Sequence, residues 1–328
     1  MSLDADTIVD RRRMRRKLTF WRVFAVFIAI GALVAVAAVL RAPGTEGWAG
    51  FPGGSIARVT ISGLIRTDQQ RVEALDRLGK SRARAVILHI NSPGGTTSGS
   101  EQLHDSVMRL KAQKPLVVVV DGLAASGGYI VAIAGDHIVA QETSLVGSIG
   151  VLFQYPNFGD LLKTIGVKVE EIKSSPLKAA PNGFEPTSPE ARAAVESIVA
   201  DSYAWFRGIV KERRHLDDPT LERVADGRVF TGRQGIGLKL VDELGDETAA
   251  LAWLEKEKNI DPKTPVRDYR LRERFGDLPF LHSMAIGALN AIGLGTFARR
   301  LEEWGAVQAL ERLNLDGLLA LWHPSIAN

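Results

Sequence analysis

The sequence predicts an α/β fold with a largely parallel sheet. Its 328 residues are 45% hydrophobic and 24% charged, the composition of a globular protein and not of a disordered or fibrous one. Short β-branched runs alternate with helical stretches over residues 55–258, as in proteins built from strand–helix units. Continuous apolar runs such as LVVVV at 116–120 are typical of strands covered on both faces, which favours parallel pairing.

The first 41 residues indicate a membrane topology signal. The basic block RRRMRRK precedes 18 uncharged residues that lie between Arg22 and Arg41. As a helix this stretch would be about 27 Å long, close to the hydrocarbon thickness of a bilayer. The positive-inside rule keeps the basic block in the cytoplasm. We therefore expect a cytoplasmic arm over 1–20, a transmembrane signal-anchor over 21–41, and a domain on the periplasmic side of the cell (inner) membrane.

A cleaved signal peptide is the alternative for this segment. Ala35, Ala37 and Ala38 supply small residues of the kind found at cleavage sites. The apolar stretch is longer than the 7–15 residues, roughly, of a usual signal-peptide core, which favours the anchor.

The elements after the anchor are expected in a regular order. Residues 42–54 are rich in glycine and proline and indicate a linker. Strands are expected at 56–62, 84–90, 116–121, 137–140 and 167–172. Helices are expected near 67–80, 97–112, 126–135, 188–214 and 246–258. Residues 259–328 are predicted to form a helical segment for oligomerisation or membrane-surface contact, because the uncharged stretch 278–298 is too weakly hydrophobic to favour a second span.

The basic balance of the chain comes from its N-terminus alone. Residues 1–41 hold eight Lys and Arg against three Asp, so the remaining 287 residues carry a net charge of −2. Nucleic-acid binding would need a basic face on the folded domain, so we expect no nucleic-acid partner. The chain has no cysteine, which excludes disulfides, thiolate metal sites and a cysteine nucleophile.

Two glycine-rich turns, residues 91–95 (NSPGG) and 124–129 (AASGGY), each follow a predicted strand and open a helix. Glycine permits close backbone approach, and a helix N-terminus offers free N–H groups, which together suit an anion. Neither turn matches GxxxxGK[ST] or GxGxxG, so nucleotide binding is not favoured. Ser126 is placed like the serine of a nucleophile elbow, where the N–H groups of Gly127 and Gly95 could converge on an oxyanion. A small residue chosen for tight packing is the alternative for a lone AASGG.

A serine nucleophile needs a base, and the sequence leaves its identity open. None of the six histidines lies in a glycine-rich setting, and the mid-helix His104 is the nearest to a candidate. A lysine can serve if burial lowers its pKa from about 10.4 toward 7–8. Lys173 and Lys178 flank the turn KSSPLK, although position alone is compatible with two solvated loop lysines.

An ordered set of segments resembles the signal peptide peptidase A family. The segments are INSPGG, DGLAASGGY, GSIGV at 147–151, KSSPLK, and ADGRVFTG at 225–232 followed by GLKLVDELG. The resemblance covers residues 55 to about 258 and includes the preceding anchor. It implies a membrane-anchored Ser–Lys peptidase whose domain, 55–258, has the Clp-protease/crotonase-like fold of repeated ββα units.

The resemblance also implies a role for each matching residue. Ser126 matches the nucleophile and Lys178 the general base. Ser148 matches the serine that hydrogen-bonds this lysine. Gly95 and Gly127 match the oxyanion donors by motif position.

The implied activity is hydrolysis of peptide bonds by acyl transfer, with no metal or other cofactor. The implied substrates are remnant signal peptides, and the implied assembly is a ring-shaped homo-oligomer in which one subunit's serine meets a neighbour's lysine. Lys173 becomes a loop residue. Ser175 and Leu177 stand where family members commonly have glycine and an aromatic residue, which bears on substrate preference.

Three other functions compete with this interpretation. A membrane quality-control peptidase of the same fold is the nearest alternative. A crotonase-type acyl-CoA enzyme would share the fold and the oxyanion donors, but its cofactor is cytosolic. A membrane-anchored scaffold with a vestigial Ser126 is the non-enzymatic alternative.

Overall fold

The computed structural model describes residues 21, 54–271 and 318–322. The chain divides into two compact units, Met1–Phe51 and Pro52–Asn328, and only Trp21 of the first unit is described. The predicted cytoplasmic arm, the rest of the signal-anchor and nearly all of the linker therefore lie outside the described residues. Within the described part of the chain, no helix combines the length and apolar character needed to cross a bilayer.

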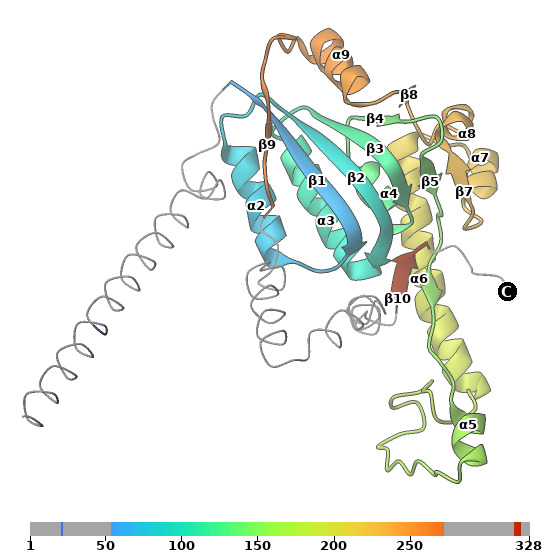
Figure 1. The fold of residues 1–328 in the computed structure, drawn as a ribbon. Coiled ribbons are helices and arrows are strands. Elements are labelled where there is room, and N and C mark those ends of the chain that lie inside the picture. Colours follow the sequence, from blue (N-terminus) through green and yellow to red (C-terminus); the bar gives the residue numbers. More distant parts are fainter. Residues whose placement is uncertain (1–20, 22–53, 272–317, 323–328) are drawn as a thin grey trace, which may run out of the picture. The chain divides into compact units, whose positions relative to one another are not determined.

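Among the described residues, a ten-stranded and mostly parallel sheet forms the centre of the second unit (Figure 1). Four parallel strands at its middle pair in chain order: β1 (Ile56–Ile65), β2 (Ala85–Thr96), β3 (Leu116–Ala125) and β4 (His137–Ala140). These strands confirm the four predicted from β-branched runs at the same places.

The apolar runs are buried because helices cover both faces of the sheet. Alternate residues such as Ile87, Val117 and Val119 pack with Ala250 and Leu254 of α9 (Glu247–Lys258). The helices α3 (Thr97–Lys111) and α4 (Gly127–Ala132) contact β2, and α2 (Gln69–Lys80) packs against α3. Successive side chains of a strand point to opposite faces, so an all-apolar strand needs a cover on each side.

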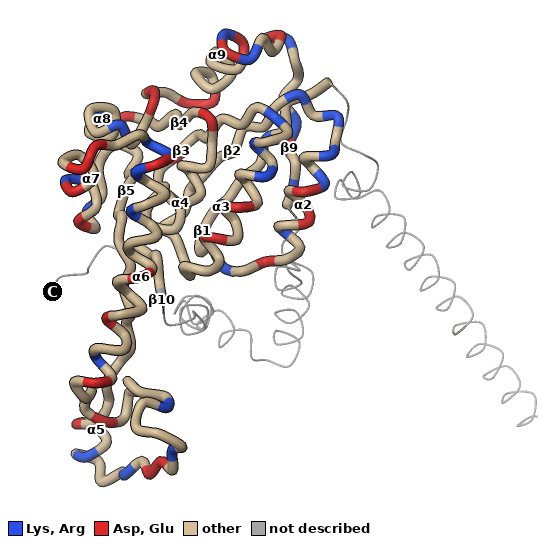
Figure 2. The backbone as a smooth tube through the Cα atoms, turned by 180° about the vertical axis from the view of Figure 1, so that it is seen from behind, with Lys and Arg blue, Asp and Glu red and all other residues tan. Residues whose placement is uncertain are grey.

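The remaining elements extend this centre. They are β5 (Leu145–Gly147), β6 (Leu152–Phe153), α5 (Gly159–Thr164), α6 (Pro189–Arg214), α7 (Asp218–Val224), β7 (Val229–Thr231), α8 (Gly232–Gly237), β8 (Glu243–Leu244), β9 (Val266–Asp268) and β10 (Leu318–Leu321). Acidic and basic residues are interspersed along α2, α6, α7 and α9 (Figure 2).

The long helix α6 begins at a capped N-terminus and is anchored at its other end. The Ser188 side chain accepts from the N–H of Ala191, and Pro189 occupies the first turn. Near the C-terminus, Phe206 is buried and Arg213 donates to the carbonyl of Ile133. Residues 154–187, which we call the arm, lie with α5 at the end of α6 that is remote from the sheet (Figure 1).

One sequence prediction fails in this unit. The strand predicted at 167–172 is absent: these residues pair with no strand among those described, because the arm lies away from the sheet. Most of the predicted helical segment 259–328 lies outside the described residues, and its described parts contribute two strands. Strand β9 pairs with β1, and β10 pairs with β2 and β6. The uncharged stretch 278–298 lies outside the described residues.

Candidate active site

Ser126 occupies a strained turn between β3 and α4. Its φ of 53° and ψ of −118° lie in a region that residues with a Cβ rarely adopt. The turn is held by the Ser126 N–H, which donates to the Gly147 carbonyl at 2.8 Å. Although Ser126 stands at the N-cap position of α4, its side chain makes no capping hydrogen bond. The hydroxyl is therefore not engaged in holding the helix start.

Ser148 lies beside Ser126 because two parallel strands end together. The register of β3 and β5 pairs Ala125 with Gly147, which are the last residues of the two strands. The residue that follows each strand is a serine. Paired strands lie about 4.8 Å apart. Ser148 also has a φ of 53°, and its N–H donates to the Arg228 carbonyl at 2.8 Å. Both serines are thus fixed by backbone hydrogen bonds.

The two glycine-rich turns lie against each other at the same place. A Cβ added to Gly94 would lie 2.7 Å from the Gly127 nitrogen, so the first turn touches the second. A Cβ on Gly95 would lie 1.8 Å from the Ile65 carbonyl oxygen, and one on Gly127 would lie 2.1 Å from Ser100 Oγ. Real Cβ atoms do not approach other heavy atoms this closely. The site therefore needs glycine at both of the predicted oxyanion donors.

Two buried residues that the sequence analysis did not single out support these turns. Ser92 Oγ donates to the Gly63 carbonyl at 2.7 Å and accepts from the Gly94 N–H at 3.1 Å. The Tyr129 hydroxyl donates to the Leu240 carbonyl at 2.9 Å and anchors α4. Burial raises the pKa of Tyr129, which keeps its phenol neutral. Ser92 lies in the run INSPGG and Tyr129 in the run AASGGY. Their places in these two glycine-rich motifs are the sequence signal that could have identified them.

Lys178 lies apart from this cluster. It is exposed on the arm, where its backbone N–H donates to the Ser175 carbonyl at 3.1 Å. Lys173, by contrast, pairs through Nζ with Glu171 at 2.5 Å and Glu185 at 2.7 Å. Hydrogen bonds to these two carboxylates raise the pKa of Lys173 and favour its charged form. Lys173 is thus poorly suited to act as a base.

His104, the histidine nearest to a candidate base, shows no link to Ser126 among the described residues. Its Nδ1 lies 3.1 Å from Asp105 Oδ1, and its Nε2 is buried without a hydrogen-bond partner. The structure therefore brings together Gly95, Ser126, Gly127 and Ser148, and leaves Lys178 on the arm.

A cavity of about 430 Å³ opens beside Ser148. It is bordered by Val199 and Tyr203 of α6 and by Leu321 and Trp322 at the end of β10. Its apolar lining suits the side chains of a peptide.

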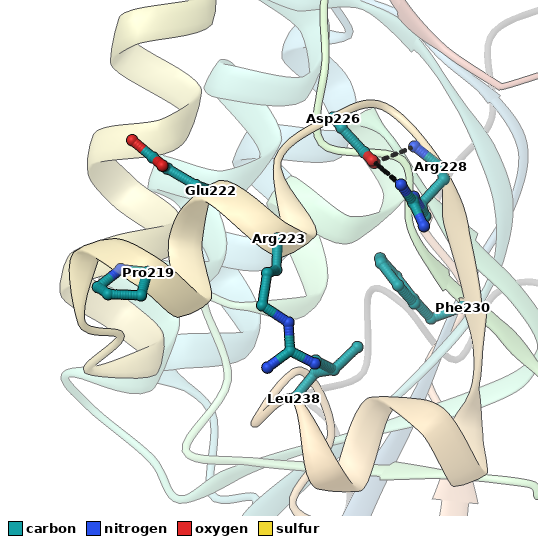
Figure 3. Close-up of a pocket in the computed structure, with 7 residues that line it drawn as sticks. All are labelled: Pro219, Glu222, Arg223, Asp226, Arg228, Phe230 and Leu238. Carbon is teal, nitrogen blue, oxygen red and sulfur yellow. Dashed lines mark hydrogen bonds and ion pairs between the residues drawn. The ribbon is translucent and has the colours of Figure 1, made fainter.

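A larger hollow of about 550 Å³ lies between α7 and β7 (Figure 3). Arg223, Phe230 and the ion pair of Asp226 with Arg228 line it. It contains neither serine, so the smaller cavity is the one related to the candidate site.

Comparisons with known proteins identify the family to which this chain is similar. The sequence profile of Peptidase family S49 matches residues 108–261, and that of Clp protease matches residues 66–144. The second match confirms the Clp-protease-like α/β fold. Together the two matched ranges include both glycine-rich turns, Ser126, Ser148 and Lys178.

Three relatives cover much of the chain. A candidate protease of Methanocaldococcus jannaschii is 34% identical over 259 residues, which are 74% of this chain and 83% of the relative. A candidate protease of Synechocystis is 32% identical over 209 residues, which are 63% of this chain and 76% of the relative. A candidate signal peptide peptidase SppA of Enterococcus faecium is 31% identical over 219 residues, which are 65% of this chain and 64% of the relative.

Proposed function

Because the chain belongs to peptidase family S49, we propose that it is a membrane-anchored endopeptidase with a Ser126–Lys178 dyad. Membership makes the chain a hydrolase and a serine protease. The observation that supports Ser126 as the nucleophile is its strained turn beside Ser148 and the paired glycine turns. A strained residue that the surrounding structure holds in place is common at active sites.

The proposed chemistry is acyl transfer. Ser126 Oγ attacks the carbonyl carbon of a peptide bond while the neutral amine of Lys178 takes the hydroxyl proton. The N–H groups of Gly95 and Gly127 stabilise the negative charge that develops on the carbonyl oxygen. The lysine returns the proton to the leaving amine, and water then hydrolyses the ester on Ser126. Ser148 orients the lysine amine.

We propose that Lys178 enters the site of a second copy of the chain. In a single copy it is exposed on the arm, and the arm and the first half of α6 carry nine of the twelve exposed large apolar side chains among the described residues. Exposed apolar patches of this kind mark association surfaces. Burial disfavours the charged form of an amine, so an interface that encloses Lys178 would favour the neutral base. A head-to-tail contact that closes produces a ring.

Labelling with a serine-reactive fluorophosphonate tests the nucleophile. The wild-type chain should be labelled and should hydrolyse a peptide, and Ser126→Ala should abolish both. The matched control is Ser62→Ala, which removes an exposed hydroxyl from β1. A labelled and active Ser126→Ala chain would refute the proposed function.

Mixing two inactive variants tests the shared site. In assemblies of Ser126→Ala with Lys178→Ala, a site works when an intact serine meets an intact lysine from the neighbour. Random equal mixing gives this pairing at about a quarter of sites. Zero activity in verified mixed assemblies would reject sharing and leave Ser126 as the nucleophile.

The proposed substrates are remnant signal peptides, and the proposed location is the periplasmic face of the inner membrane. The name of the Enterococcus relative and the basic block before the apolar stretch support these two proposals. An alkaline phosphatase fusion at residue 50 should be active, and a cytosolic reporter there should be silent. The reverse result would reject the location and leave the peptidase activity untouched.

A further inference from the structure

Strand β10 lies in a groove of the sheet beside the candidate site. Strand β2 pairs with β3 as far as Ser92 and Ala124, and the last residues of β2, from Gly94 to Thr96, pair with β10 instead. Strand β10 runs antiparallel to the end of β2, with Ala320 opposite Gly95 and Leu321 opposite Gly94. The groove thus accepts an extended chain segment.

Both edges of β10 are paired. Its other edge runs antiparallel to β6, with Leu319 opposite Leu152. The pairing continues one residue further, since the Trp322 N–H donates to the Pro93 carbonyl at 2.7 Å. Main-chain pairing on two sides holds an extended peptide with little regard to its sequence.

The Ala320 carbonyl points at the two glycine turns. A Cβ built on Gly94 would lie 2.0 Å from the Ala320 oxygen, and one built on Gly127 would lie 2.9 Å from it. The absence of both Cβ atoms makes room for this carbonyl. Ala320 is also opposite Gly95 in the β2–β10 register, so its carbonyl lies beside both residues proposed as oxyanion donors.

Ser126 is inaccessible while β10 is in place. The residue is 1% exposed, and Ala320 is completely buried. A nucleophile that acts on peptides must be reached by them, so an element near it has to leave. Strand β10 is four residues long and enters from a part of the chain that is remote in sequence from β2 and β6. It is therefore the element best suited to move.

We propose that β10 is a built-in occupant of the substrate groove and competes with peptide substrates for it. This inference rests on the proposed function of Ser126. A substrate pairs with β2 and β6 as β10 does and presents its scissile carbonyl in place of the Ala320 carbonyl. The residue that carries this carbonyl is small, because the space around Ala320 is filled.

Steady-state kinetics of the full-length variant Ala320→Arg test the proposal. Arginine does not fit the closed space around residue 320, so β10 should leave the groove. An internal competitor raises the apparent KM without changing kcat, so KM for a short peptide should fall at least about fivefold at unchanged kcat. The matched control is Ala252→Arg, which changes an exposed alanine on α9 and should leave KM unchanged.

A second measurement keeps the test independent of how the variant folds. A synthetic peptide with the sequence of residues 316–323, DGLLALWH, should inhibit the wild-type chain competitively. The same peptide with arginine at the alanine position should inhibit at least about tenfold less, because bulky additions to a filled site are rejected.

Two results would overturn the inference. The first is no inhibition by the peptide. The second is a lower kcat with a lower Tm in Ala320→Arg, because β10 would then be a structural strand. If Ser126→Ala is inactive, either result rejects only the role of β10. An active Ser126→Ala chain would instead reject the proposed function itself.

Discussion

The turn around Ser126 and the arm that carries Lys178 are built in opposite ways. Around Ser126, the residues from Ala124 to Ala134 are buried without exception, and the serine's backbone is held by a neighbouring strand. On the arm, Ile172 is fully exposed and residues 167–172 belong to no strand. The first region owes its shape to packing within one chain. The second presents apolar side chains that a single chain leaves uncovered.

This difference indicates how the proposed catalytic site is divided. A close-packed region can fix a nucleophile and its oxyanion donors, because their positions follow from the core. A general base on an exposed arm is fixed only when something packs against the arm. We therefore expect changes around Ser126 to affect stability, and changes on the arm to affect assembly and activity alone.

The largest expected effect is at Lys178. Lys178→Arg should lose as much activity as Lys178→Ala, about 10²–10⁴-fold, because guanidinium does not deprotonate in proteins and cannot act as a base. Initial rates on a fluorogenic peptide would measure both variants. The matched control is Lys173→Ala, which should stay within about threefold of wild type, because solvent-screened ion pairs such as those of Lys173 with Glu171 and Glu185 contribute little. An active Lys178→Arg chain would leave the lysine a purely electrostatic role.

The next effect concerns the apolar surface of the arm. The double change Val169→Glu with Ile172→Glu should reduce the assembly mass and lower activity at least about tenfold, the equivalent of about 1.4 kcal/mol per interface. Both side chains are exposed in one chain, so Tm of the separated chain should not change. Sedimentation velocity would measure the mass.

The control for the arm is Ile236→Glu, which places the same charge on an exposed isoleucine of α8. Its mass and activity should match wild type. A double variant that keeps both mass and activity would show that the arm is not an association surface.

The sequence was most informative where local pattern and packing agree. The apolar runs at 84–90 and 116–121 predicted β2 and β3, because a strand that is buried on both faces is apolar at nearly every position. The paired glycine runs also predicted where the backbone of two turns must touch. Glycine is required at positions 95 and 127 because a Cβ at either position would collide with neighbouring atoms.

The sequence failed where structure depends on partners distant along the chain. The alternation VKVEEI at 167–172 has the period of a strand, but a strand needs a neighbour and this segment has none among the described residues. The strand β10 was missed because LLAL is short, and its pairing with Gly94 and Gly95 is set more than 200 residues away. The local sequence shows neither that 167–172 lacks a partner strand nor that β10 has one.

A smaller effect tests the packed side of the comparison. Tyr129→Phe removes the only hydroxyl that bonds the Leu240 carbonyl in the described structure, and both groups are buried. Leaving a buried carbonyl unpaired should cost about 1–3 kcal/mol of unfolding free energy, measurable by urea denaturation. The matched control is Tyr269→Phe, whose hydroxyl donates to the Ala74 carbonyl at a half-buried place and should cost less. Equal costs would mean that the packing around α4 confers no special rigidity.

The smallest effect concerns pH and the attachment of α9. The Glu247 carboxylate accepts a hydrogen bond from Arg58 Nε at 2.6 Å and lies 2.8 Å from His89 Nε2. The hydrogen bond from Arg58 is the main cause that lowers the pKa of Glu247 below its ordinary value near 4.5. A carboxylate with a lowered folded-state pKa stabilises the fold above its unfolded pKa, and this stabilisation disappears as pH falls through the folded-state value.

Glu247→Gln should therefore lower the unfolding free energy at pH 7 by about 1 kcal/mol, a modest amount because Arg58 is partly exposed and solvent screens the pair. The difference between wild type and variant should shrink below pH 4.5 and vanish once Glu247 is protonated in the folded chain. Urea denaturation at several pH values between 3 and 7 would measure it. Glu255→Gln, on the exposed face of α9, should show no such difference at any pH. Peptidase activity at pH 7 should be unchanged in both variants, since α9 packs on the sheet face opposite the turn that holds Ser126. A loss of activity confined to Glu247→Gln would mean that the attachment of α9 also positions the site.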